Sequence, residues 1–206
     1  MAKNNLKERI IATALVLFEK KGYHGVTVEQ IVKECNTSKG GFYHNFKSKD
    51  ELLYAIHDIF ISYVLDKAKK AYATYDTPVS RLYAIIQSFT KVFGLYKSHI
   101  TVFYQESMYL REEFQHIIQK KRNQYRDIIL QVIKEGQESG DFRTEVPANI
   151  ATMALIGMIN WSYKWFKQDG PLTIEEIAHI FTDLTLHSLL TEESLANVKK
   201  TSHYIF

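Results

Sequence analysis

The chain has 206 residues, of which 46 % are hydrophobic, and its formal net charge at pH 7 is +3. It contains no apolar run of about 18 residues, so we expect no membrane-spanning helix, and its N-terminal segment lacks the apolar core of a signal peptide. Cys35 is the single cysteine, which excludes an intrachain disulfide framework and a cysteine-based zinc site. We therefore expect a cytoplasmic protein that needs no metal or other cofactor.

The basic residues are concentrated near the N-terminus. Residues 1–50 contain nine lysines and arginines against five acids, whereas the two signs nearly balance in the remainder. Such an excess fits a solvated helix surface. It fits a nucleic-acid partner equally well, because phosphate contacts supply much of the affinity of DNA-binding proteins. Charge alone leaves both interpretations open.

The first part of the chain predicts two helices and a tight turn. Apolar residues spaced by three and four predict a helix over about residues 4–21. Thr27 is placed to cap a second, short helix that ends near Cys35, with Gln30 in the capping-box position. Asn36 follows directly, and asparagine tolerates the left-handed conformation that a tight turn between helices requires.

Two further helices follow this turn. Ser38 is placed to cap a third short helix over about residues 39–45, and Ser48 to cap a long fourth helix over about residues 49–72. The third helix begins with two adjacent glycines, although glycine is a poor helix former. This departure from helix propensity indicates that something other than local stability requires glycine there.

The rest of the chain is also helical in pattern. Apolar periodicity predicts helices over about residues 78–96, 98–109, 113–139, 148–167 and 174–190. Loops are predicted at residues 141–147 and 167–173, and the tail at 191–206 is compatible with either a continued helix or a mobile end. No strand pattern, repeat or low-complexity tract is present, so the predicted fold class is all-α.

Three short helices with a tight turn between the second and third describe a helix-turn-helix, whose third helix enters the DNA major groove by its N-terminal end. Gly40 and Gly41 would let this helix come close to DNA, because they lack the Cβ atom that would hold it away. Ser38 would be both a helix cap and a phosphate donor. Lys39 would contact a phosphate or a guanine edge.

The aromatic residues of the third helix are expected to divide by face. Phe42 and Phe46 are four residues apart, so they share one face of the helix and are predicted to pack in the core. Tyr43 and His44 carry polar groups at the tips of flat rings and are predicted to reach outward toward DNA.

Two stretches resemble the TetR family of bacterial transcriptional regulators. They are "RIIATALVLFEKKGYHGVTVEQIVKEC" and "TSKGGFYHNFKSKDELL", and the second holds the pattern Ser-x-Gly-x-Phe-Tyr-x-x-Phe-x-x-Lys in register. The resemblance extends from Leu6 to about Phe60. The chain departs from the family at Cys35, Asn36 and Thr37, where alanine, glycine and valine are usual.

The resemblance implies a division of the chain and a set of contacts. Residues 1–50 would form the helix-turn-helix DNA-binding domain, and residues 51–206 an all-helical domain for ligand binding and dimerisation. The protein would bind double-stranded operator DNA as a homodimer, pairing through the helices at 148–167 and 174–190. The positions aligned with DNA contacts are Thr27, Ser38, Lys39, Gly40, Gly41, Tyr43, His44, Lys47 and Lys49.

The resemblance also implies a small hydrophobic effector bound in the C-terminal half. The candidate ligand-binding residues are Phe89, Phe93, Tyr96, Phe103, Tyr104, Gln105, Arg111, Trp161 and Trp165. The segment "GMINWSYKWF" is similar to one in the acyl-CoA-responsive branch of the family, so an acyl-CoA or lipid-like metabolite is the expected effector. The alternatives are a repressor responding to drugs or aromatic compounds, which would control an efflux or catabolic operon, and a ligand-independent DNA-binding protein.

The sequence does not favour an enzyme. Asp183 and His187 are four residues apart on one predicted helix, but no serine or cysteine nucleophile can be placed beside them. No histidine, cysteine and acidic residues have metal-ligand spacing, and no phosphate-binding loop or dinucleotide fingerprint is present. We instead expect a repressor whose effector pivots the fourth helix and so lowers operator affinity.

Overall fold

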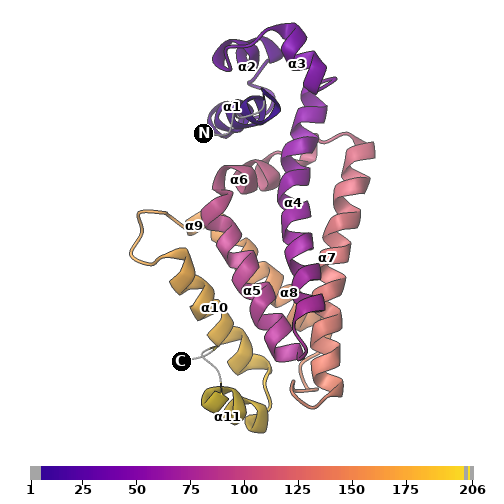
Figure 1. The fold of residues 1–206 in the computed structure, drawn as a ribbon, viewed down its shortest axis with the longest axis vertical. Coiled ribbons are helices and arrows are strands. Elements are labelled where there is room, and N and C mark those ends of the chain that lie inside the picture. The colour runs from indigo at the N-terminus through magenta and orange to yellow at the C-terminus, as the bar shows by residue number, and fades with distance from the viewer. Residues whose placement is uncertain (1–5, 202–203, 205–206) are drawn as a thin grey trace. The chain divides into compact units, whose positions relative to one another are not determined.

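The computed structural model describes residues 6–201 and residue 204. Its helices (Figure 1) are α1 (Leu6–Lys21), α2 (Val28–Glu34), α3 (Lys39–Asn45), α4 (Lys49–Thr74), α5 (Pro78–Leu95), α6 (Lys97–Gln105), the 3₁₀ helix η1 (Ser107–Tyr109), α7 (Glu112–Glu138), α8 (Ala148–Asn160), α9 (Ser162–Trp165), α10 (Ile174–Leu189) and α11 (Glu192–Thr201). Extended pairing within the described residues is limited to one bridge between Phe142 and Leu190. The predicted all-α fold class is therefore confirmed.

The predicted caps and turn of the N-terminal helices are confirmed. The Thr27 hydroxyl accepts the backbone N–H of Gln30 at 3.2 Å, and the Gln30 side chain accepts the N–H of Thr27 at 3.0 Å. Asn36 has a φ of 50°, the left-handed conformation expected for the turn. The Ser38 hydroxyl accepts the N–H of Gly41 at 3.0 Å. These local hydrogen bonds satisfy amide groups that the start of a helix leaves without a partner.

Two predicted helices are broken in the structure. The predicted helix at 98–109 divides into α6 and η1, and the predicted helix at 148–167 divides into α8 and α9. At each break a backbone N–H donates to the carbonyl three residues back, as between Lys164 and Trp161 at 3.0 Å. This tighter turn changes the helix direction without interrupting the apolar pattern, which is why the sequence did not reveal it.

The chain divides into two compact units. Unit 1 comprises the residues up to Ser62 together with Tyr96–Lys120, and unit 2 comprises Tyr63–Leu95 and the residues from Lys121 onward. The long helices α4 and α7 each contribute residues to both units. In unit 1, α1 packs against α2, α3 and α6. Packing thus groups α6 with the N-terminal helices, whereas the sequence-based boundary at residue 50 places it in the ligand-binding domain.

Unit 2 is built around α5 and α10, which pack against each other. At its base, the Phe142 ring lies against α7 so closely that a Cβ atom at Gly136 would be 2.1 Å from the ring. Phe142 is 1 % exposed, and its N–H donates to the Gly136 carbonyl at 2.8 Å. A glycine is therefore required at position 136, in the last turn of α7.

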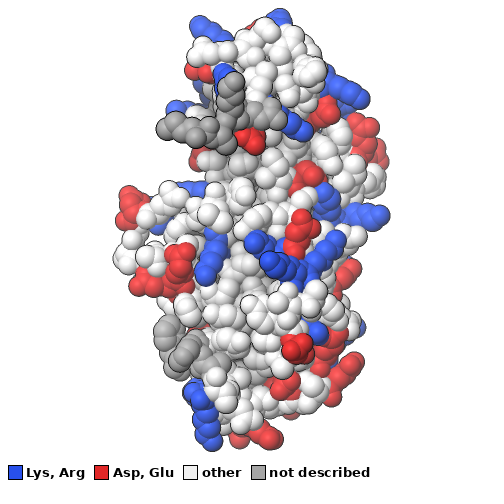
Figure 2. Space-filling model, in the orientation of Figure 1, with Lys and Arg blue, Asp and Glu red and all other residues white. Residues whose placement is uncertain are grey.

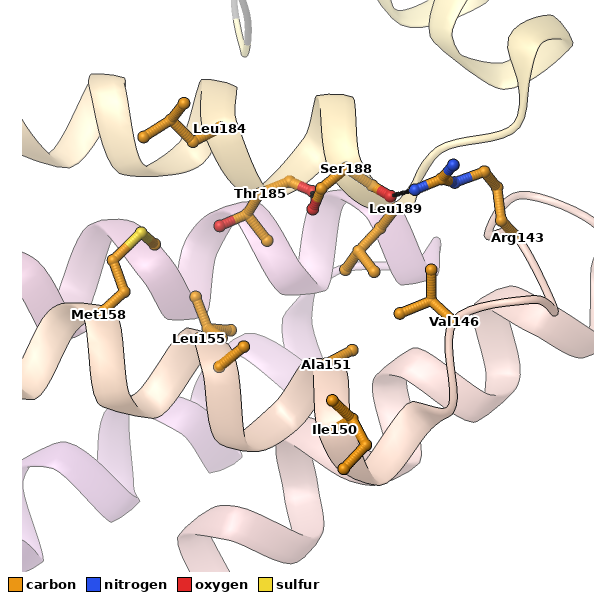
Figure 3. A pocket seen from close by; sticks show the side chains of 11 residues that line it. Arg143, Val146, Ile150, Ala151, Leu155, Met158, Leu184, Thr185, Ser188 and Leu189 are labelled. Atoms are coloured by element: carbon orange, nitrogen blue, oxygen red, sulfur yellow. Dashed lines mark hydrogen bonds between the residues drawn. The ribbon is translucent and has the colours of Figure 1, made fainter.

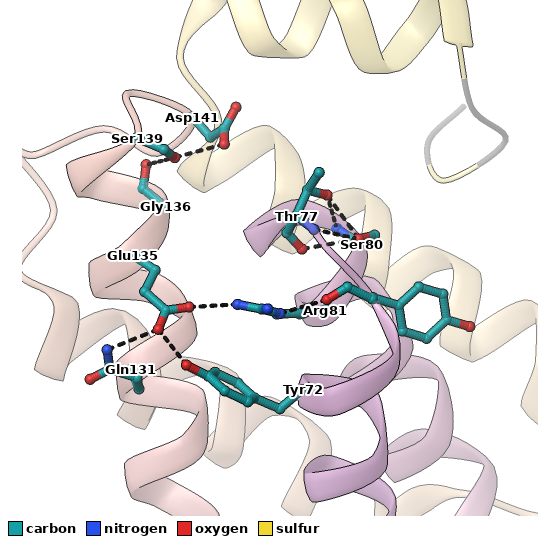
Figure 4. Close-up of polar contacts among 10 residues, drawn as sticks. Tyr72, Thr77, Ser80, Arg81, Gln131, Glu135, Gly136, Ser139 and Asp141 are labelled. Carbon is teal, nitrogen blue, oxygen red and sulfur yellow. Dashed lines mark hydrogen bonds and ion pairs between the residues drawn. The ribbon is translucent and has the colours of Figure 1, made fainter.

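A network centred on one carboxylate ties three helices of unit 2 together (Figure 4). Glu135 on α7 accepts hydrogen bonds from the Tyr72 hydroxyl of α4 at 2.5 Å, from Arg81 of α5 at 2.8 Å and from Gln131 at 2.9 Å. Burial alone would raise the pKa of the Glu135 carboxyl, but the hydrogen bonds and the Arg81 charge outweigh it and lower the pKa. Glu135 is therefore an ionised anchor that α4, α5 and α7 share.

Candidate functional site

The helix-turn-helix of unit 1 consists of α2, the turn at Asn36 and α3. Phe42 on α3 and Phe46 directly after it are 0 % and 2 % exposed, which confirms the prediction that both pack in the core. Arg9 on α1 donates a hydrogen bond to the carbonyl of the buried Cys35 and so joins α1 to the turn. These contacts hold one side of α3 against the unit and leave the other side facing solvent.

The solvent-facing side of α3 and its surroundings carry most of the predicted DNA contacts. The exposed ones are Thr27, Ser38, Lys39, Gly40, Tyr43, His44 and Lys47. Tyr43 is 51 % exposed, while its ring meets the edge of the buried Phe42 ring at a centroid distance of 5.3 Å. The division of aromatic residues by face is therefore observed as predicted. The resulting surface is formed by polar and small side chains on capped, short helices.

The two glycines of α3 have different surroundings. A Cβ atom on Gly40 would meet nothing nearer than the Ser38 hydroxyl at 3.7 Å. A Cβ atom on Gly41 would lie 2.6 Å from the Thr37 hydroxyl and 3.3 Å from a methyl group of Leu6. Only Gly40 therefore fits the predicted role of clearance for DNA. Gly41 instead allows α3 to pack closely against the preceding turn and α1.

The lysines also have different surroundings. Lys39 pairs with Glu29 of α2 at 2.6 Å, and this contact lowers the pKa of Glu29 and raises that of Lys39. The Lys49 ammonium instead donates to the carbonyls of Tyr23 at 2.9 Å and Val26 at 2.7 Å, and burial lowers its pKa. Lys49 thus tethers α4 to the α1–α2 loop, a role different from the predicted phosphate contact.

Charge is not segregated over the surface that Figure 2 displays. Basic and acidic side chains are interspersed on this face, and uncharged residues lie between them. The basic excess of residues 1–50 does not form one large positive surface in this view.

Helices α8 and α10 of unit 2 expose an apolar surface. Ile150, Met153 and Gly157 on α8 and Trp161 directly after it recur at spacings of three and four, and all four are exposed. On α10, Leu184 is 54 % exposed. The sequence analysis predicted that these helices are apolar, but it did not identify which of their apolar residues are exposed. Exposed and buried apolar residues look the same in the sequence.

A shallow groove runs between α8 and α10 beside this surface (Figure 3). Its volume is about 240 Å³, and Leu155 and Met158 point into it from α8 toward α10. Arg143 closes one end by donating a hydrogen bond to the Ser188 carbonyl. A Cβ atom on Gly157 would contact nothing within 4 Å. The groove and the glycine therefore leave room for apolar side chains from outside this chain.

Two sequence families match the two parts of the chain. Residues 10–56 match the family described as bacterial regulatory proteins, tetR family. Residues 75–189, more than half of the chain, match the tetracyclin repressor-like C-terminal domain. The chain belongs to the TetR family. It is therefore a DNA-binding transcriptional regulator and not an enzyme.

Relatives of this TetR-family chain cover most of its length. The transcriptional repressor KstR2 of Mycobacterium tuberculosis is 20 % identical over 92 % of this chain and 95 % of its own length. Its structure has the same fold, with a TM-score of 0.84 over 92 % of this chain and 97 % of KstR2. The transcriptional regulator QacR of Staphylococcus aureus is 29 % identical over 78 % of this chain and 87 % of its own length.

One solved structure that is similar to this chain contains both kinds of partner predicted for it. AibR in complex with isovaleryl coenzyme A and operator DNA is 26 % identical, with a TM-score of 0.77 over 90 % of this chain and 98 % of AibR. AibR thus carries an acyl-CoA and an operator on a fold that this chain shares.

The structure divides the nine predicted effector contacts of this TetR-family protein between the two units. Unit 1 contains Tyr96, Phe103, Tyr104, Gln105 and Arg111, and unit 2 contains Phe89, Phe93, Trp161 and Trp165. Phe89, Phe93 and Phe103 are at most 4 % exposed. Gln105 is exposed, and the two tryptophans are 61 % and 44 % exposed.

Arg111, which was predicted to contact the effector, has polar partners within the protein. Its guanidinium donates to the carboxylate of Asp50 at 3.0 Å and to the Ser48 hydroxyl at 2.8 Å, both at the start of α4. It is therefore held by protein groups of unit 1.

Among the described residues, no three histidine, cysteine or acidic side chains come together as metal ligands would. The same residues contain no helix with the length and apolar character of a membrane span. Asp183 and His187, which are close on α10, pair with each other at 3.2 Å.

Proposed function

We propose that this protein is a cytoplasmic repressor that binds operator DNA as a homodimer and is released by a small hydrophobic effector such as an acyl-CoA. The observation that carries the proposal is the surface of α3. Large apolar side chains of that helix are buried, while Ser38, Lys39, Gly40, Tyr43 and His44 are exposed together. Hydroxyl, amine, imidazole and backbone groups are the donors that bind phosphates and base edges.

The other residues that were predicted to contact DNA have different roles in this proposal. Thr27 caps α2 and offers its hydroxyl to a phosphate, and Lys47 is an exposed cation just before α4. Gly41 contributes through packing of α3 rather than through contact. Lys49 contributes by fixing the α1–α2 loop. Contacts to DNA are therefore expected from α3, from the capping residues Thr27 and Ser38, and from Lys47.

Dimerisation is proposed to occur through α8 and α10. Exposed apolar side chains on both helices, an adjoining apolar groove and the unoccupied space facing Gly157 suit the same surface of a second copy. A two-fold axis makes such an interface self-complementary. The dimer would present two α3 helices to successive major grooves, whose centres are about 34–36 Å apart.

The class of effector is proposed from the relatives and from the apolar character of the C-terminal half. AibR was solved with isovaleryl coenzyme A, and KstR2 is described as a ketosteroid regulator. Both names point to hydrophobic acyl or steroid compounds. Release requires that the effector bind the DNA-free conformation more tightly than the DNA-bound one.

DNA binding is tested by letting the wild-type protein select duplexes from a random-sequence pool. The most enriched duplex, called the selected duplex below, is then used in salt titrations. Replacing Lys47 with alanine should weaken binding and reduce the slope of log affinity against log salt by about one, as loss of one phosphate contact predicts. Lys134→Ala, which removes an exposed cation from α7, is the matched control. Failure to enrich any duplex would contradict the proposal.

The effector is tested by titrating the complex with acyl-CoA thioesters, beginning with isovaleryl-CoA and using coenzyme A as control. A thioester that releases the duplex at concentrations where coenzyme A does not supports the proposal. Native mass spectrometry of the protein mixed with a cell extract covers other hydrophobic ligands. If no thioester releases the duplex and no metabolite is retained, the protein is a ligand-independent regulator.

A further inference from the structure

Asp50, in the first turn of α4, is bound from two sides within unit 1. The Tyr23 hydroxyl, in the α1–α2 loop, donates to Oδ1 of Asp50 at 2.5 Å, and Nε of Arg111 donates to Oδ2 at 3.0 Å. Nη2 of Arg111 also donates to Oγ of Ser48, which itself caps α4 by accepting the N–H of Glu51. One carboxylate and one guanidinium thus join the α1–α2 loop, the start of α4 and the residue that precedes α7.

Aromatic contacts join the same three segments. The Tyr109 ring stacks on Tyr23 at a centroid distance of 5.9 Å and meets the edge of His24 at 4.3 Å. In the first turn of α7, the Phe114 ring stacks on Tyr54 of α4 at a centroid distance of 4.5 Å. Residues 109–114 therefore contact both the α1–α2 loop and the first turns of α4.

These contacts lie at both ends of the helix-turn-helix. The α1–α2 loop immediately precedes α2, and the start of α4 closely follows α3, so fixing the loop to α4 fixes both ends of the segment that carries α3. The Lys49 ammonium strengthens this link through the carbonyls of Tyr23 and Val26. Because docking geometry determines whether a helix reaches base edges, small changes at these two ends alter DNA affinity without any change in the contacting residues.

We infer that Arg111 is a positioning residue for operator binding, which acts through Asp50 and Ser48 to hold the α1–α2 loop and the start of α4 in the DNA-binding arrangement. The inference rests on the proposed DNA-binding function and goes beyond it by adding a residue that does not touch DNA. The forked guanidinium suits this role, since it bonds two groups at once, which a lysine cannot do with the same geometry.

The position of Arg111 in the chain also connects its contacts to α7. Arg111 immediately precedes α7, and the same helix carries Glu135, the anchor of unit 2, near its other end. A movement of α7 along its axis would therefore change the Arg111–Asp50 contact directly.

The test is a double-mutant cycle measured as affinity for the selected duplex over a range of salt concentrations. The variants are Arg111→Ala, Asp50→Ala, the double variant and Arg111→Lys, and each is checked for folding by circular dichroism. Arg126→Ala is the matched control, because it removes an arginine from α7, the helix that follows Arg111, and the partner of Arg126 is its neighbour Asp127. Arg111→Ala is expected to weaken binding about tenfold with an unchanged salt slope, and the double variant to be no weaker than Asp50→Ala.

Other results separate the alternatives. A salt slope reduced by about one would make Arg111 a direct phosphate contact and overturn the inference. Additive effects of the two single variants, or unchanged affinity, would also overturn it. If Arg111→Ala does not fold, Arg111→Lys decides, because it keeps the charge but loses the fork: weaker binding at an unchanged slope supports the inference, and wild-type affinity rejects it. A wild-type protein that selects no duplex fails the proposed function before any variant is made.

Discussion

Helix α3 of unit 1 and helices α8 and α10 of unit 2 expose opposite kinds of surface. On α3, the large apolar side chains are inside, with Phe42 and Phe46 at most 2 % exposed, and polar or small residues face solvent. On α8 and α10, apolar side chains remain outside, with Ile150 at 58 % and Leu184 at 54 % exposed. The apolar pattern of α3 is thus satisfied by its own chain, whereas that of α8 and α10 is not.

The proposed function assigns these two surfaces to two different partners. A clustered apolar surface that remains after folding favours a partner of like chemistry, and a second copy of the chain supplies one. A surface of hydroxyl, amine and backbone groups favours a polar, charged partner such as DNA. The ion pairs of the two units also differ in their exposure to solvent. The side chains of Lys39 and Glu29 beside α3 are 62 % and 61 % exposed, while those of Arg81 and Glu135 in unit 2 are 20 % and 23 % exposed.

The largest effect is expected from a charge on the apolar surface. Leu184→Glu should convert the proposed dimer to a monomer, because it would place a carboxylate in an interface that excludes water. A monomer binds only one half-site, so affinity for the selected duplex should fall about 100-fold. Sedimentation velocity and DNA titration measure the two effects.

Leu95→Glu is the control for this experiment. Leu95 is 67 % exposed at the end of α5, and its neighbour Gly94 lies against Ile174 at the start of α10, ten residues before Leu184. Leu95 is not part of the exposed apolar surface proposed as the interface, so a charge there should not remove a dimer contact. The dimer and the DNA affinity should both survive this change. A Leu184→Glu protein that is still dimeric would show that α8 and α10 do not form the interface.

The next largest effect is expected from the glycine pair of α3. Gly40→Ala should weaken DNA binding about tenfold while leaving the fold intact or slightly more stable, because alanine favours a helix and the new methyl group meets nothing nearer than the Ser38 hydroxyl at 3.7 Å. Gly41→Ala should instead unfold at a lower temperature than Gly40→Ala, because its methyl group crowds Thr37 and Leu6. Thermal unfolding and DNA titration of both variants measure this contrast. Equal behaviour of the two variants would remove the distinction between clearance and packing.

Sequence reasoning succeeded where the decisive interactions are local. The capping box of Thr27 and Gln30, the left-handed Asn36 and the Ser38 cap all involve residues at most three apart. Side-chain type and spacing therefore carry enough information to place the turn and the short helices. The same holds for the faces of α3, since helical period alone separates Phe42 from Tyr43.

Sequence reasoning failed where the decisive neighbour is distant in the chain. The role of Lys49 depends on carbonyls at Tyr23 and Val26, more than twenty residues earlier. The difference between Gly40 and Gly41 depends on Leu6. The sequence does not show whether an apolar residue on α8 packs against its own chain or against a second copy. Only the three-dimensional arrangement distinguishes these cases.

The charge pair of unit 2 should affect stability rather than DNA affinity. Glu135→Gln is expected to lower the free energy of unfolding at pH 7 by about 1 kcal/mol, because Tyr72 and Arg81 lose a charged acceptor. The folded-state pKa of Glu135 lies below its ordinary value of 4.5. Its contribution is therefore present above that pH and is lost as the pH falls through the folded-state pKa.

Urea unfolding at a series of pH values measures this effect. The difference between wild type and Glu135→Gln should be largest near neutral pH and should shrink below about pH 4.5. Glu138→Gln, an exposed position one turn from Glu135 on the same helix, is the control. A difference that stays constant down to acid pH would show that the ionised carboxylate is not what the variant loses.

The smallest effect is expected from the exposed charge pair beside α3. Glu29 both occupies the Lys39 ammonium and places a negative charge next to the DNA-binding surface. Glu29→Gln should therefore tighten binding to the selected duplex about two- to threefold at low salt, with little change in thermal stability, because an exposed ion pair contributes little to folding. Glu34→Gln removes an exposed acid from the same helix and controls for net charge. If Glu29→Gln instead weakens binding while Glu34→Gln does not, the Glu29 carboxylate orients Lys39 toward DNA, and the pair belongs to the interface rather than competing with it.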